Sequence, residues 1–222
     1  MTAVPLKREY GPTLGEILGP RWRRASGVVR ALWVAALAVL VAAGVSAALT
    51  LSSPTLSQGG ATPFSFSYGG LDRATPERGG YARVWRLREG RLEDSFAVGP
   101  LVLPPYRGAL GAALALYAAR YIPHLAAARL PGQRGFTLRG EGSTQIDSVS
   151  GYATYNIFYT TTLGGREMYG RDLLLLPERP GARRGVTIAM LTAAAGNRQV
   201  TSPLDVGIKG ALEEPLSTFA LG

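Results

Sequence analysis

The sequence predicts an α+β domain, an antiparallel sheet with helices packed on it, behind one N-terminal transmembrane helix. Three observations lead to this fold class. An uncharged apolar stretch covers residues 31–51, and runs rich in aromatic and β-branched residues, joined by glycine pairs, follow it. The Ala- and Leu-rich segment 108–129 has helical spacing, and a second helix start lies near residue 202. Strands in hairpins with segregated helices define the α+β class.

Composition excludes several kinds of chemistry. The 222 residues include no cysteine and one histidine, so a disulfide framework, thiolate catalysis and sulfur-built zinc or iron–sulfur sites are excluded. The formal net charge is +9, from 24 basic and 15 acidic side chains. Because 22 of the basic residues are arginine, a skew typical of GC-rich coding, the charge does not by itself indicate nucleic acid as a partner.

Residues 31–51 are predicted to span a membrane. They contain no charged residue and would form a helix about 31 Å long, which matches the hydrocarbon core of a bilayer. A cleaved signal peptide fits less well, because the leader before the apolar run has 30 residues, although Val45-Ser46-Ala47 resembles a cleavage site. Six basic residues precede the span and no charge follows it until after Leu71, so we expect the amino terminus in the cytoplasm.

Four parts follow from this reading. Residues 1–30 form a cytoplasmic basic tail, 31–51 the transmembrane helix, 52–63 a linker, and 64–222 an extracytoplasmic α+β domain. The linker is assigned from its small polar residues, its glycine pair and its two prolines.

The first half of the domain contains a strand, a hairpin and a helix. Residues 64–68 alternate at period two, and 81–88 and 91–101 are strands joined by the turn Glu89-Gly90. The helix over 108–129 presents apolar residues on one face, and Pro123 should kink or divide it.

The second half is richer in strands. A strand is predicted over 136–142, and the runs 152–163 and 166–176 form a hairpin through Gly164-Gly165. One face of 152–163 should pack under a helix, while the other is a second packed face or an aromatic binding surface. A strand over 186–192 follows, and Ser202-Pro203-Leu204-Asp205 has the pattern of a helix start.

The order of these elements resembles the PsbP-like superfamily. The features that carry the resemblance are Phe64-Ser65-Phe66-Ser67-Tyr68, the hairpin 152–176, and the closing Leu216-Ser217-Thr218-Phe219. The resemblance implies an α/β/α sandwich and an extracytoplasmic or accessory binding module that assists larger membrane or transport assemblies. It implies no catalytic residues, because the family has no universal catalytic set.

Arginines supply the candidate binding residues. We expect an anion-binding patch formed by Arg86, Arg88, Arg91, Arg179, Arg183 and Arg184. In the competing interpretation, these arginines are separate solvated charges that prevent the sheet edges from pairing with other chains. His124 stands alone in a helix without an orienting acid, so we interpret it as structural. Glu141 and Asp147 are the carboxylates that a hydrolase or transferase would use.

The sequence therefore predicts a single-pass, membrane-anchored extracytoplasmic binding or accessory module that is not an enzyme. We expect no cofactor, metal or catalytic residue, and no nucleic-acid partner. The expected partners are the lipid bilayer and a protein in the membrane or envelope, with an anionic envelope component as the other ligand. Two alternatives stay open: an envelope hydrolase or transferase with paired carboxylates, and an accessory subunit of a larger membrane complex.

Overall fold

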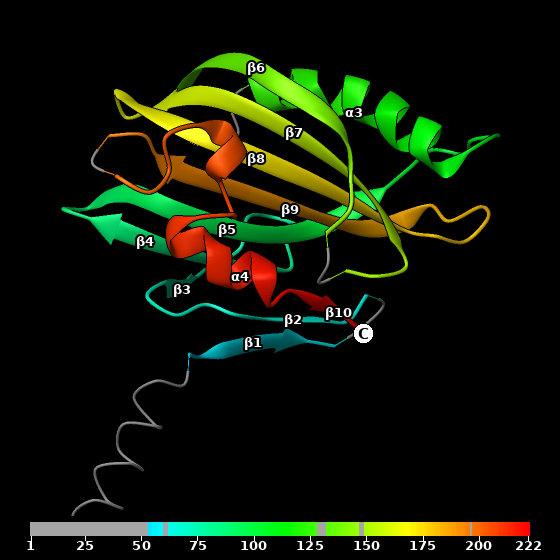
Figure 1. Cartoon of the computed structure of the whole chain (residues 1–222), viewed down its shortest axis with the longest axis horizontal. Coiled ribbons are helices and arrows are strands. Elements are labelled where there is room, and N and C mark those ends of the chain that lie inside the picture. Colours follow the sequence, from blue (N-terminus) through cyan, green and yellow to red (C-terminus); the bar gives the residue numbers. More distant parts are fainter. Residues whose placement is uncertain (1–52, 60–61, 128–131, 147–148, 196) are drawn as a thin grey trace, which may run out of the picture. The chain divides into compact units, whose positions relative to one another are not determined.

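The computed structural model describes residues 53–59, 62–127, 132–146, 149–195 and 197–222 (Figure 1). The chain divides after Ser52, and the unit that begins at Ser53 contains all of these residues. The predicted tail (1–30) and transmembrane helix (31–51) lie outside the described residues. Within the described ranges, no helix is long and apolar enough to cross a membrane.

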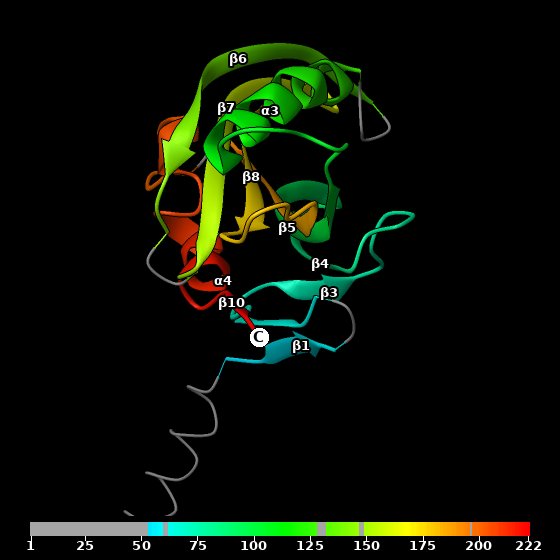
Figure 2. The same ribbon diagram turned by 90° about the vertical axis from the view of Figure 1, so that its right-hand side faces the viewer.

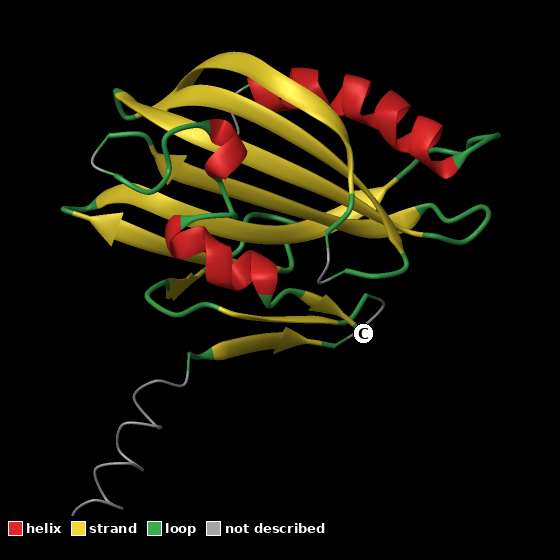
Figure 3. Ribbon diagram, viewed as in Figure 1, coloured by secondary structure: helices red, strands yellow, loops and turns green. Residues whose placement is uncertain are grey.

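The strands of the main sheet run antiparallel to their neighbours and are drawn in yellow in Figure 3. The sheet has seven strands, in the order β3-β4-β5-β9-β8-β7-β6, which are labelled in Figure 1. Their bounds are β3 Asp72–Ala74, β4 Ala82–Arg88, β5 Arg91–Val102, β6 Gln133–Thr144, β7 Tyr152–Leu163, β8 Arg166–Pro177 and β9 Arg184–Ala193. The predicted strands from residue 81 onward are confirmed, with ends that differ by a few residues. The predicted antiparallel sheet is likewise confirmed.

The hairpin between β7 and β8 forms as predicted. The two strands pair from Tyr152 with Pro177 to Leu163 with Arg166. Gly164 and Gly165 both have positive φ, at 57° and 79°. A two-residue turn of this kind needs positive φ at both positions, and only glycine adopts it without a steric penalty from Cβ. The glycine pair therefore fixes the register of the longest hairpin in the sheet.

A second, three-stranded sheet has the order β1-β2-β10, with β1 Thr55–Gln58, β2 Phe64–Ser67 and β10 Ala220–Leu221. Strand β1 lies in the segment that the sequence assigned to a linker, so ordered structure begins before residue 64. Leu56 is the reason, because its side chain is buried in the core while its neighbours Thr55 and Ser57 stay exposed. One apolar residue among small polar ones forms a strand only because β2 pairs with it.

The main sheet is covered on both faces (Figure 2). Helix α3 (Leu110–Ala126) contacts β6, β7 and β8 on one face. The other face is covered by the small sheet and by η1 (Pro203–Asp205), η2 (Gly210–Leu212) and α4 (Glu213–Ser217). Leu173 and Leu175 enter the core on that side, and Leu174 and Leu176 enter the core under α3. The expected α/β/α arrangement is thus altered, because the second layer contains strands as well as helices.

Both faces of β7 are packed. Tyr155, Ile157 and Tyr159 are buried on the α3 side, and Thr154 and Asn156 are buried on the other side. An aromatic binding surface on this strand is therefore not formed, and the packing interpretation applies to both faces.

Pro123 does not divide helix α3. The helix is continuous from Leu110 to Ala126, with Leu114 and Leu125 buried on its inner face. Pro123 stands three residues before the end of the helix. The hydrogen bond that it cannot donate is therefore lost near the C-terminal end, where the helix is already ending.

The helix predicted at Ser202 is a single 3₁₀ turn. The predicted capping interactions are present, since the side chains of Ser202 and Asp205 bond each other's backbone, and Asp205 accepts from Lys209 Nζ at 2.7 Å. The hydrogen bond from Lys209, together with those from the backbone and side chain of Thr201, lowers the pKa of Asp205 below its usual range. The helix ends because Val206 is extended and Gly207 has φ of 76°. A Cβ on Gly207 would lie 2.8 Å from Met190 and Leu216, so the chain turns where a side chain has no room.

Candidate functional site

The six candidate arginines do not form one surface. Asp94, near the β4–β5 turn, pairs with Thr192 at one end of β9, while Val102 pairs with Arg184 at the other end. The two ends are eight residues apart along β5, a separation of about 26 Å at strand spacing. Arg86, Arg88 and Arg91 therefore belong to one end of the sheet, and Arg179, Arg183 and Arg184 belong to the opposite end.

A β-bulge brings acidic partners to two arginines of the first group, Arg86 and Arg88. Arg86 pairs with Asp94 while Leu87 pairs with Leu92, so Glu93 is an extra residue on β5. A bulge interrupts the alternation of side chains, and both neighbouring acids reach the same arginine. Arg86 Nε lies 3.1 Å from Glu93 Oε2, and Arg86 Nη2 lies 2.6 Å from Asp94 Oδ2. Ion pairing within the sheet thus occupies the charge of Arg86.

Two further contacts complete this cluster. Arg88 Nη1 lies 3.6 Å from Glu93 Oε1, and Thr192 Oγ1 donates to Asp94 Oδ1 at 2.5 Å. Burial raises the pKa of Asp94 above its ordinary value, against the opposing effects of the Thr192 hydrogen bond and the Arg86 charge. Asp94 is 1% exposed, so it offers no surface to a ligand. This cluster holds the end of the sheet together.

In the second group, Arg179 and Arg183 lie on the loop between β8 and β9, and Arg184 is the first residue of β9. Arg179, Arg183 and Arg184 line a hollow of about 620 Å³ together with Val102 and Pro180. Within the described part of the chain, none of the three arginines forms an ion pair. Arg183 is held in place, because its Nε donates to the Leu103 carbonyl at 3.1 Å.

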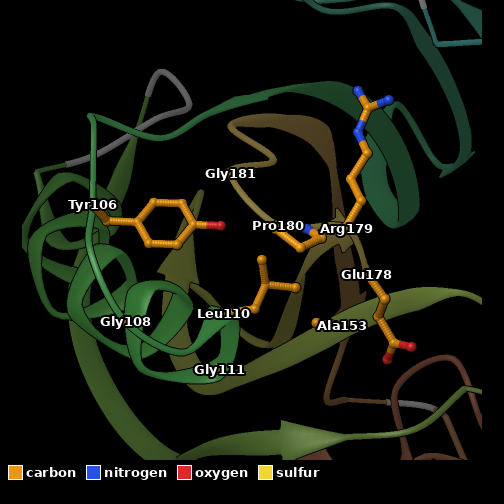
Figure 4. A pocket seen from close by; sticks show the side chains of 9 residues that line it. All are labelled: Tyr106, Gly108, Leu110, Gly111, Ala153, Glu178, Arg179, Pro180 and Gly181. Atoms are coloured by element: carbon orange, nitrogen blue, oxygen red, sulfur yellow. The ribbon is translucent and has the colours of Figure 1, made fainter.

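A second pocket adjoins this hollow and has a volume of about 630 Å³ (Figure 4). Its lining residues are Tyr106, Gly108, Leu110, Gly111, Ala153, Glu178, Arg179, Pro180 and Gly181. They come from the β5–α3 connection, the first turn of α3, the start of β7, and the loop after β8. Arg179, Pro180 and Gly181 line both hollows and form the wall between them. We call the two hollows together the loop-178 cleft.

Tyr106 joins the two sides of this cleft. Its hydroxyl donates to the Ala182 carbonyl at 2.9 Å, so the segment before α3 is tied to the arginine loop. Pro104-Pro105 ends β5, and Gly108 with φ of 100° turns the chain into α3. Sequence reasoning missed Tyr106, although its position between a proline pair and a helix start marks an ordered turn.

Helix α3 and the segment just before its start contribute Gly108, Leu110 and Gly111 to the lining of the same pocket. Its N-cap residue is Ala109, which gives no side-chain hydrogen bond, and the first turn contains no acid. Glu178 is the one acid among the residues that line this pocket. The three arginines give the neighbouring hollow the chemistry of an anion-binding surface, beside a pocket with largely apolar walls.

The groups considered for catalysis lie elsewhere. His124 is in the last turn of α3, about 21 Å along the helix from Leu110. Glu141 is exposed on β6. Burial is the main cause of the raised pKa of Tyr155, and the negative charge of Glu141 raises it further. Asp147 lies outside the described residues, so the structure does not test its pairing with Glu141. Among the residues that the structure describes, no group of three or more His, Asp or Glu could hold a metal ion.

Comparison with known proteins shows similarity to solved structures only. No family model and no curated protein matches the chain. The chain is similar to the cyanobacterial PsbP protein (CyanoP) from Synechocystis sp. PCC 6803, with 15% identity, a TM-score of 0.45, and coverage of 77% of this chain and 94% of that one. It is also similar to LpqN, involved in cell envelope biogenesis of Mycobacterium tuberculosis, with 9% identity, a TM-score of 0.45, and coverage of 76% and 90%.

Proposed function

We propose that this chain is a single-pass, membrane-anchored binding module that is not an enzyme. Residues 31–51 anchor it, the domain from Ser53 lies outside the cytoplasm, and the loop-178 cleft binds an anionic partner of the membrane or envelope. The presence of an early hairpin, a helix, a run of antiparallel strands and a closing helix supports placing the domain in the PsbP-like superfamily as part of this proposal.

One observation carries the binding role, namely the contrast between the two arginine groups. At the β4–β5 end, Arg86 and Arg88 have carboxylate partners on the next strand. At the other end, Arg179 and Arg184 have no such partner among the described residues and stand beside a pocket. A guanidinium group is a planar donor suited to carboxylate and phosphate, so arginines without an internal partner are available to an external anion.

We expect the double substitution Arg179→Gln, Arg184→Gln to weaken binding of a soluble polyanion by at least about tenfold, because each charge-assisted hydrogen bond contributes about 1.5–3 kcal/mol. The measurement is titration of the full chain, held in zwitterionic nanodiscs, with inorganic polyphosphate. Binding by the unmodified chain should also weaken as salt is raised, since exposed charges are screened.

The matched control is Arg88→Gln, Arg91→Gln, which removes the same charge from exposed residues at the other end of the sheet. The control should change the affinity by no more than about twofold, because beyond one Debye length of about 10 Å a charge is largely screened. Equal weakening by both double variants would show that only net charge matters, and the proposed cleft would be rejected.

The proposed topology has its own test, which the absence of cysteine makes simple. Leu204→Cys places the only thiol of the chain at a side chain that is 58% exposed in the domain. We expect a membrane-impermeant maleimide to label it in intact spheroplasts. Thr2→Cys, in the predicted cytoplasmic tail, should react only after lysis. Labelling of Thr2→Cys alone before lysis would invert the topology.

A further inference from the structure

We infer that the ligand of the loop-178 cleft is a phosphorylated amphiphile, a molecule with one anionic head and an apolar chain, such as an anionic lipid. The inference rests on the proposed function and names the ligand class for the same site. It follows from the way in which a cationic hollow and a mostly apolar pocket meet at a shared wall.

The pocket at the start of α3 suits the apolar part of such a ligand. Tyr106 and Leu110 point into it, whereas the charged ends of Glu178 and Arg179 point away from its centre (Figure 4). Ala153 and Pro180 complete the apolar lining. Its volume of about 630 Å³ lies in the range of small-molecule sites. An alkyl chain that lies against Leu110, Ala153 and Pro180 gains affinity with each methylene that it buries.

The adjoining hollow suits the head. Arg179, Arg183 and Arg184 line it, and the wall that it shares with the apolar pocket is only three residues long. A single molecule can therefore place its chain on one side of Pro180 and its phosphate on the other. Bidentate arginine contacts favour phosphate geometry.

An extended anionic polymer is the less suitable partner. A polymer is bound best by cationic side chains that continue along a surface. Here the other predicted arginines lie at the opposite end of the sheet, where Arg86 and Arg88 on β4 already contact Glu93 on β5. The three predicted arginines that line a hollow lie close together at one end of the sheet, and this matches a compact anionic head.

Gly111 allows the inference to be tested without disturbing the arginines. It lines the apolar pocket, lies in the first turn of α3, and a Cβ added to it would meet nothing within 4 Å. Gly111→Leu should therefore fold and partly fill the pocket. Gly111→Ala is the matched control, because it makes the same gain in helix propensity with almost no added volume.

The probe is octyl phosphate that carries a diazirine on its chain, photo-crosslinked to the full chain in zwitterionic nanodiscs and mapped by mass spectrometry. We expect labelling of the peptide that contains Tyr106 and Leu110. Gly111→Leu should reduce this labelling by at least about tenfold, which corresponds to the loss of two buried methylenes at about fourfold each. Gly111→Ala should leave it within about twofold, and unlabelled butyl phosphate should compete much less well than unlabelled octyl phosphate.

The possible failures differ from one another. If Gly111→Leu labels as the unmodified chain does, or inorganic phosphate competes as well as octyl phosphate, the cleft binds only an anionic head and the inference is wrong while the proposed function stands. Equal labelling by the matching alcohol would remove the requirement for a phosphate and also overturn it. Polyphosphate binding without site labelling would assign the cleft to a polymer. If polyphosphate binding is also unaffected by Arg179→Gln, Arg184→Gln, the proposed function itself fails.

Discussion

Replacing Phe219 with alanine is expected to lower the free energy of unfolding by about 3–5 kcal/mol, the range for large aromatic side chains removed from a core. Phe219 is fully buried although it stands close to the carboxyl end of the chain. Its ring centroid lies 5.8 Å from that of Phe64, 6.2 Å from that of Phe66 and 6.3 Å from that of Phe96. The ring therefore joins the small sheet to the main sheet.

The loss should approach the upper part of this range because the site cannot collapse easily. Phe64 and Phe66 are fixed by pairing of β2 with both β1 and β10, and Phe96 lies on a central strand of the main sheet. A cavity bounded by paired strands relaxes only partly, and the remaining volume adds to the cost. Urea denaturation of the full chain in detergent, followed by circular dichroism, measures the change.

Two variants control for side effects near the carboxyl end. Phe219→Leu keeps most of the volume and should cost less than half as much as Phe219→Ala. Ser217→Ala removes an exposed hydroxyl two residues away and should change stability by no more than about 0.5 kcal/mol. If Phe219→Ala costs no more than Ser217→Ala, the closing segment does not pack as the structure describes.

The strands of the main sheet could be predicted because their signals are local. Gly164-Gly165 specifies a tight turn, and the residues on either side favour extended backbone whatever else the chain does. These features need no knowledge of distant partners.

The features that could not be predicted depend on contacts between distant residues. Strand β1 exists because β2 pairs with it, and its own small polar residues resemble a linker. The short turn at Ser202 replaces a helix because Gly207 packs against Met190 and Leu216. The ion pairs of Arg86 depend on a β-bulge at Glu93, which shifts β5 against β4. The sequence shows where the arginines are, but it does not show which of them form ion pairs.

Arg171 gives the second large effect, because it is a buried cation that connects the main sheet to the C-terminal segment. It is 6% exposed on β8, and its Nε donates to Asn156 Oδ1 at 2.8 Å. Its Nη1 donates to the Val206 carbonyl at 3.0 Å, and its guanidinium carbon lies 5.3 Å from the centre of the Phe158 ring. Burial lowers the pKa of Arg171 to about 10, so the side chain is still cationic at neutral pH.

Arg171→Met is expected to destabilise the domain by about 2–4 kcal/mol. The substitution keeps the length of the side chain but leaves two buried oxygens without a donor, and each lost hydrogen bond to a charged group costs about 1.5–3 kcal/mol. Relief of the desolvation of a buried charge offsets part of this loss. Arg171→Lys retains the charge but can reach only one of the two acceptors, so it should fall between the parent and Arg171→Met.

Hydrogen exchange shows whether Arg171 stabilises mainly the attachment of the C-terminal segment to the main sheet or the whole domain. The Ile208 and Lys209 amides donate to the Asp205 carbonyl, next to the Val206 carbonyl that Arg171 holds. In Arg171→Met these two amides should exchange faster by a larger factor than the Ala113 amide, which bonds within α3 on the other face of the sheet. Equal acceleration at all three would mean that Arg171 stabilises the sheet as a whole. If Arg171→Met is more stable than the parent, the free-energy cost of burying the charge exceeds the stabilisation from its two hydrogen bonds, and Arg171 does not stabilise the attachment of the C-terminal segment.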